Sequence, residues 1–218
     1  MKYIKKSEEP QCLANWKALA NENWTPTYED DFRGKVKTEV HDWLLHEQGY
    51  ICCYCGIRVT RDTSHIEHLK PRSAYPELAL DYRNLLVSCQ RKRTQSEHCA
   101  YKKDDWYDEH LMISPLQSNC AEFFRYSEAG EILPADKPDK QAAATTIFKL
   151  GLNISKLTAN RKKAIEDILE VIEVLSDEDI KKLIQGFNQP DANGECEEFS
   201  TAIIYILNQT LLYRHPMI

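Results

Sequence analysis

The chain has 218 residues and a mass of 25.4 kDa; 42% of its residues are hydrophobic, 28% are charged, and the net charge is −6. This composition is typical of a globular protein large enough for one or two domains. It contains no apolar run of the ~20 residues that cross a bilayer, and its first ten residues lack the apolar core of a secretory signal, so we expect a cytoplasmic protein without a membrane partner.

The first predicted region, residues 1–49, is helical. Apolar residues recur at helical spacing after Pro10, which predicts a first helix there. The segment from Thr27 to Asp30 resembles a capping box, so we predict that a second helix begins at Thr27 and ends near Gly49.

The second region, residues 50–129, is predicted to be short in regular structure and rich in loops. It has a tight turn at 52–56, strands at 64–69 and 82–88, and a short helix that begins at Cys99. The segment 130–141 begins with a glycine and contains two prolines, which favours a linker there.

The third region, residues 142–218, is predicted to be helical. An amphipathic stripe covers 165–175, a new helix opens at Ser176, and a mostly buried helix covers 199–212. The fold class that follows is α+β and mostly helical.

Charge is distributed unevenly along the chain. Between Cys52 and Lys103 there are ten basic and five acidic residues, which gives this window a net charge of +5. Because the whole chain carries −6, the remainder carries −11. A local positive charge attracts a polyanion, so the central region is the part suited to nucleic acid.

Four of the eight cysteines have the spacing of metal ligands. Cys52 and Cys55 supply two thiolates from one turn, and Cys89 and Cys99 can supply the other two. Four sulfurs close a tetrahedral site, so this Zn²⁺ is structural. The insert at 90–98 must loop out for the second pair to converge, and the alternative is a set of reduced cysteines without metal.

An adjacent acid and base lie between the two cysteine pairs. His68 can deprotonate an attacking water, because imidazole titrates near neutral pH. Glu67 is a hard oxygen ligand suited to Mg²⁺ or Mn²⁺, and such a cation stabilises the leaving oxygen of a phosphodiester. The pair therefore has the residue types that metal-assisted phosphodiester cleavage requires.

Three segments in this order resemble the signature of the HNH, or ββα-metal, endonucleases: Glu67-His-Leu-Lys-Pro71, Asp81-Tyr-Arg-Asn84-Leu85 and Cys89…Cys99-Ala-Tyr-Lys-Lys103. The resemblance implies a zinc-stapled ββα-metal core, with His68 as base and Asn84 holding the loop that aims His68.

The chain departs from this pattern at Ala100, where the family usually has a metal ligand. Asp104, one helical turn further on, can supply the missing oxygen, and His98 is an alternative. His65 shares the strand face of Glu67, so it is either a ligand or a partner of one.

A closer resemblance extends over most of the chain, to the PtuB-like HNH endonucleases of Septu and retron-type antiphage defence systems. It is carried by the order of several segments: Lys5-Lys-Ser-Glu-Glu-Pro10, Ser64-His-Ile-Glu-His68, Pro71-Arg-Ser73, Ile113-Ser-Pro-Leu116 and Asn153 with Arg161. The resemblance implies a partner ATPase, PtuA, which we expect to dock on 142–218, and in retrons a reverse transcriptase with its RNA–DNA product. The chain has no phosphate-binding loop of its own, so ATP-dependent control must come from another subunit.

Basic residues around the acid–base pair are the predicted contacts to nucleic acid. They are Lys70, Arg72, Arg91, Lys92, Arg93 and Lys103. For the run at 91–93 the competing interpretation is a solvated loop.

The sequence thus predicts a metal-dependent endonuclease acting in a defence complex. The alternative is a catalytically silent, zinc-stapled adaptor that joins nucleic acid to the ATPase. Ala100 favours the adaptor, whereas Glu67 and His68 favour the enzyme, because an adaptor needs no acid–base pair.

Overall fold

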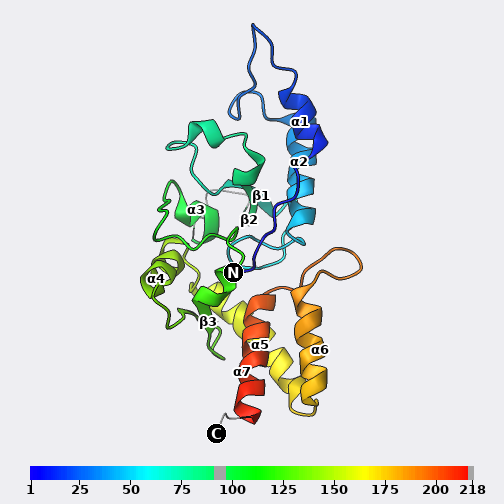
Figure 1. Ribbon diagram of the computed structural model, residues 1–218, viewed down its shortest axis with the longest axis vertical. Helices are drawn as coiled ribbons and strands as arrows, with labels where there is room; N and C mark the ends of the chain where they lie inside the picture. The colour runs from blue at the N-terminus through cyan, green and yellow to red at the C-terminus, as the bar shows by residue number, and fades with distance from the viewer. Residues whose placement is uncertain (91–96, 216–218) are drawn as a thin grey trace.

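The N-terminal helices lie at one end of an elongated molecule and the C-terminal helices at the other, with the small strands between them (Figure 1). This computed structural model describes residues 1–90 and 97–215. The α+β class is confirmed. Within the described residues, every helix is too short or too polar to span a bilayer.

Two helices form the N-terminal end. α1 (Gln11–Lys17) follows Pro10, as predicted, and α2 (Gly34–Glu47) ends just before Gly49. The predicted start of the second helix at Thr27 is wrong, because α2 begins at Gly34.

The physical reason lies in the side chain of Asp31. Thr27 accepts a hydrogen bond from the backbone N–H of Asp30 at 3.2 Å, as a cap does, but Asp31 accepts bonds from both the backbone N–H and the hydroxyl of Thr27. These bonds close a turn instead of opening a helix.

The central strands β1 (Ser64–His68) and β2 (Leu85–Cys89) pair antiparallel, with Ser64 opposite Cys89 and His68 opposite Leu85. All five residues of β2 are buried, and α2 packs against this strand. α3 (Cys99–Lys103) lies beside β2. The strand predicted from residue 82 begins later, because Tyr82–Asn84 form a 3₁₀ turn that the side chain of Asp81 caps.

The first part of the segment predicted as a linker belongs to a hairpin, and residues 136–141 are exposed. β3 (Phe124–Tyr126) and β4 (Ile132–Pro134) form a hairpin, and α4 (Lys140–Lys149) follows. The buried guanidinium of Arg161 donates hydrogen bonds to the carbonyls of Gly130 and Leu152, which fixes the hairpin turn against the C-terminal helices.

The C-terminal end contains α5 (Ser155–Ile172), α6 (Asp177–Asn188) and α7 (Ser200–Arg214), and α6 lies beside α7 (Figure 1). The predicted start of a helix at Ser176 is confirmed, because its side chain accepts a bond from the N–H of Asp179. These helices share a small apolar cluster of their own: Ile172, Ile180, Ile203 and Leu207.

His41 connects α2 to the start of β1. Its Nε2 lies 3.0 Å from Oγ of Ser64, whose hydroxyl donates to the carbonyl of Thr60, so His41 is the donor in the first bond. Burial, only partly opposed by Asp42, lowers the pKa of His41 to about 4. The ring is therefore neutral in the folded protein.

We expect His41→Gln to reduce the pH dependence of stability. A histidine whose pKa is lowered by folding gives its full stabilisation above pH 6.5 and loses it as pH falls toward 4. Between pH 7.5 and 5.5 the wild-type free energy of unfolding should fall by about 1 kcal/mol more than that of the variant, after allowance for solvent screening. Urea unfolding at the two pH values measures this, and equal losses would contradict it.

Candidate functional site

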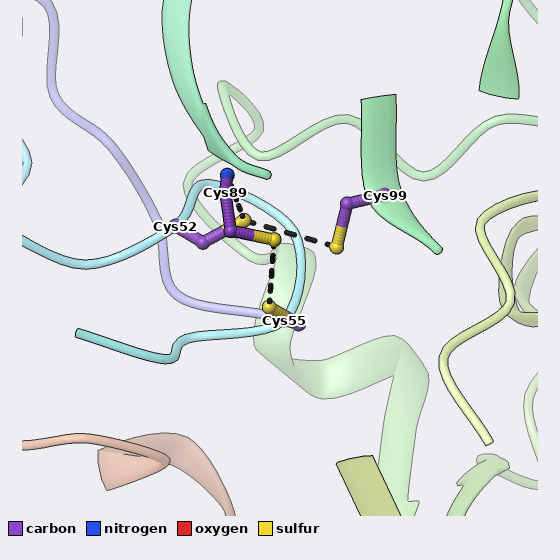
Figure 2. A group of neighbouring side chains, drawn as sticks. All are labelled: Cys52, Cys55, Cys89 and Cys99. Carbon is purple, nitrogen blue, oxygen red and sulfur yellow. Dashed lines mark hydrogen bonds between the residues drawn. The ribbon is translucent and has the colours of Figure 1, made fainter. Parts of the chain in front are cut away.

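Four buried sulfurs converge at the end of β2. The Sγ atoms of Cys52 and Cys99 lie 3.8 Å apart, as do those of Cys55 and Cys89, and all four lie within 4.8 Å of one another (Figure 2). A tetrahedral zinc with Zn–S bonds of about 2.3 Å has sulfur–sulfur edges of about 3.8 Å. The donor set and spacing therefore fit one tetrahedral metal ion such as Zn²⁺.

Without a cation, the surroundings of these sulfurs favour negative charge on Cys52 but not on Cys99. The backbone N–H of Cys89 donates to Sγ of Cys52 at 3.4 Å, and Nδ1 of His98 lies 3.1 Å from Sγ of Cys99. Burial opposes ionisation of Cys52, but bonds from neighbouring thiols hold its pKa well below the usual value. Burial, and then hydrogen bonding to the other cysteines, raises the pKa of Cys99. A cation is what allows all four sulfurs to be thiolates together.

Glu67 lies on β1 and is buried. Its Oε1 accepts a hydrogen bond from the hydroxyl of Tyr54 at 2.9 Å and forms an ion pair with Nζ of Lys103 at 3.1 Å. Nζ of Lys103 also donates to the carbonyl of His68 at 3.2 Å. The side chain of Lys103 is only 1% exposed, so in this structure it is a partner of Glu67, whereas the sequence suggested a contact to nucleic acid.

His68 is held in one tautomer. Its Nε2 lies 2.9 Å from the carbonyl oxygen of Ala79, which can only accept, so Nε2 carries the proton and Nδ1 keeps a lone pair. Burial, opposed by the bond to Ala79 and aided by the charges of Arg72 and Lys103, lowers the pKa of His68 to about 4. A neutral imidazole with a free lone pair is the form that a general base requires.

Asn84 fastens the loop that follows His68. Its Oδ1 accepts from the N–H of Lys70 at 2.8 Å, and its Nδ2 donates to the carbonyls of Lys70 and Leu78 at 2.9 and 3.2 Å. Ala79, which holds the imidazole of His68, directly follows Leu78. Asn84 thereby helps to place the acceptor for His68.

The second oxygen ligand stays a prediction. Asp104 directly follows α3 and has a positive φ of 49° and an exposed side chain. His98, the alternative ligand, lies beside the sulfur of Cys99. Among the described residues, the four cysteines form the only cluster of three or more such ligands.

His65 has the geometry of a metal-binding histidine. Its Nδ1 donates to the carbonyl of Gln90 at 2.6 Å, which leaves the lone pair on Nε2, and its ring stacks on Tyr101 at 4.3 Å. A bond from the remote ring nitrogen to a carbonyl is the usual support of a histidine ligand.

Sequence reasoning missed Tyr28, which comes from the turn before α2. Its ring packs edge-on against His68 with centroids 4.5 Å apart, and the guanidinium of Arg72 lies 4.5 Å from its centroid. Arg72 also pairs with Glu29, and the ammonium of Lys70 lies 5.2 Å from the ring of Tyr75. No spacing rule connects residue 28 to residue 68, so only the fold reveals this contact.

The predicted basic contacts Arg91, Lys92 and Arg93 lie outside the described residues. Of the aromatic residues near α3, Tyr101 stacks on His65, whereas Trp106 and Tyr107 pack against the main core.

The fold and site define an α+β protein in which a buried four-cysteine cluster adjoins a glutamate–histidine pair. The chain is 36% identical over 148 residues to a candidate HNH endonuclease of retron Vc95 from Vibrio cholerae serotype O1 biovar El Tor. The aligned region covers 65% of this chain and 70% of the relative. It is 28% identical over 210 residues to a candidate HNH endonuclease of retron Ec83 from Escherichia coli, covering 76% and 79%. It is 27% identical over 180 residues to the Septu protein PtuB of Bacillus thuringiensis, covering 79% and 62%.

No family model matches the chain. The similarity to these relatives nevertheless shows the family. The chain belongs to the PtuB-like HNH endonuclease family of antiphage defence.

We expect Cys55→Ser to reduce bound zinc from about one ion per chain to less than half, because the site loses one of its four ligands. The melting temperature should fall by about 10 °C, equivalent to about 3 kcal/mol. Elemental analysis and thermal unfolding measure the two effects.

Cys120→Ser is the matched control, since Cys120 is also buried but lies outside the sulfur cluster. Full zinc content in the Cys55 variant, or equal loss in both variants, would contradict the assignment.

Proposed function

We propose that the chain is a metal-dependent HNH endonuclease that cleaves phosphodiester bonds of nucleic acid, as the effector of a Septu- or retron-type defence system with an ATPase subunit. The observation that carries this proposal is the state of His68. It is neutral, it has its proton on Nε2, and it adjoins a buried carboxylate.

In this mechanism Nδ1 of His68 takes the proton from a water as that water attacks the phosphorus. The carbonyl of Ala79 accepts from Nε2–H and stabilises the imidazolium that forms. Glu67 would hold a divalent cation such as Mg²⁺ or Mn²⁺, with Asp104 or His65 completing the ligand set. When bound, such an ion supplies Lewis-acid stabilisation of the leaving oxygen.

Partner binding is proposed for the C-terminal region, 142–218. Two relatives are named as Septu protein PtuB, which supports a PtuA-like ATPase as partner. Retron relatives support a reverse transcriptase with its RNA–DNA product as a further partner. Large apolar side chains at the C-terminal end, Val174 at 86% and Tyr213 at 82% exposure, are available for such contacts.

One observation favours the alternative, a silent adaptor that binds nucleic acid and the ATPase. The ammonium of Lys103 already neutralises Glu67, and Ala100 offers no ligand beside it. If the chain is an enzyme, it must therefore bind its divalent cation through few protein ligands.

The deciding experiment replaces His68 by Gln within the assembled defence system. The side-chain amide of glutamine reaches as far as Nε2 of histidine, so it can still donate to the carbonyl of Ala79, but it cannot accept a proton from water. We expect cleavage to fall at least about 100-fold, with assembly and nucleic-acid binding retained.

His110→Gln is the control, because His110 is exposed and takes no part in the site described above. An adaptor predicts instead that the His68 variant keeps its protective effect against phage. Sequencing of nucleic-acid ends in activated cells supplies the readout of cleavage.

A further inference from the structure

We propose that Tyr54 is a positioning residue that orients Glu67 for its divalent cation, so that the cysteine turn and the carboxylate act as one unit. This inference rests on the proposed function, because it concerns the same carboxylate. Tyr54 lies inside the turn between the two zinc ligands Cys52 and Cys55.

The turn that carries Tyr54 is firmly tied. The N–H of Cys52 donates to the carbonyl of Ile57 at 2.8 Å, and the N–H of Gly56 donates to the carbonyl of Cys52 at 3.1 Å. A third bond, from the N–H of Cys53 to the carbonyl of Val87 at 3.0 Å, joins the turn to β2. With two sulfurs of the turn on a common metal, the backbone at residue 54 has little freedom.

The phenol of Tyr54 is placed to act on the carboxylate alone. The residue is 1% exposed, so its hydroxyl has little access to water, and it donates to Oε1 of Glu67 at 2.9 Å. A phenol keeps its proton at neutral pH, so it is a donor here. Burying a hydroxyl without such a partner is costly, which makes this bond a durable constraint.

Two donors from different elements of the fold contact the same oxygen of Glu67. Tyr54 reaches Oε1 from the cysteine turn and Lys103 reaches it from the end of α3. Lys103 supplies the balancing charge, and Tyr54 supplies a directional bond that fixes the plane of the carboxylate. Both contacts are made by Oε1, so the proposal assigns the cation to Oε2.

The test compares Tyr54→Phe with Tyr82→Phe in the full chain. Tyr82 is a matched control, because it is 2% exposed and its hydroxyl also donates to a glutamate, Glu47, at 2.8 Å. Mn²⁺ affinity is measured by electron paramagnetic resonance and zinc content by elemental analysis. Steady-state cleavage by the assembled system gives kcat and KM.

We expect Tyr54→Phe to weaken Mn²⁺ binding about tenfold and to lower kcat by a similar factor. KM should change less than about twofold, because phosphate contacts made elsewhere are kept. Zinc content should stay complete, and Tyr82→Phe should match the wild type in all four quantities. Mn²⁺ affinity of Tyr54→Phe within about twofold of wild type would overturn the proposal.

A variant that restores the donor guards against misfolding. If Tyr54→Phe loses zinc, 4-aminophenylalanine at this position must recover both zinc and Mn²⁺ affinity, and failure to recover Mn²⁺ affinity overturns the proposal. Wild-type protein that binds Mn²⁺ through Glu67 but cleaves no nucleic acid overturns the proposed function, not the role of Tyr54. Unchanged Mn²⁺ affinity in Glu67→Gln overturns both.

Discussion

The convergence of four buried sulfurs is the constraint on which the centre of this protein depends. Cys52 and Cys55 lie in one turn, Cys89 ends β2, and Cys99 begins α3 (Figure 2). The two strands between the halves of the cluster form only five pairs, which is marginal for an isolated hairpin. A metal ion bound by the four sulfurs would contribute folding free energy where a small sheet cannot stabilise itself.

The elements that carry the four cysteines also contact Glu67 and His68. The cysteine turn contributes Tyr54 to Glu67, and α3 contributes Lys103 to both Glu67 and the backbone of His68. The loop after β1 is fixed separately by Asn84 and supplies the carbonyl that sets the tautomer of His68. The orientations of Glu67 and His68 thus depend on contacts from three other parts of the fold.

Sequence patterns predicted the local features well and the long-range ones poorly. The turn that brings Cys52 and Cys55 together, the cap at Ser176 and the strand around Glu67 depend on nearby residues, so they could be predicted directly. The start of α2 was missed because Asp31 competes for the groups of Thr27, a choice that propensity does not decide. Lys103 was predicted as a contact to nucleic acid, because nothing local shows that its side chain turns inward to Glu67.

Anomalous X-ray scattering from crystals soaked in Mn²⁺ would locate both ions. We expect a zinc peak at the centre of the four sulfurs and a manganese peak beside Glu67, on the side of Oε2, within reach of a phosphate that His68 can serve. Absence of zinc between the sulfurs, or manganese bound away from Glu67, would contradict this expectation.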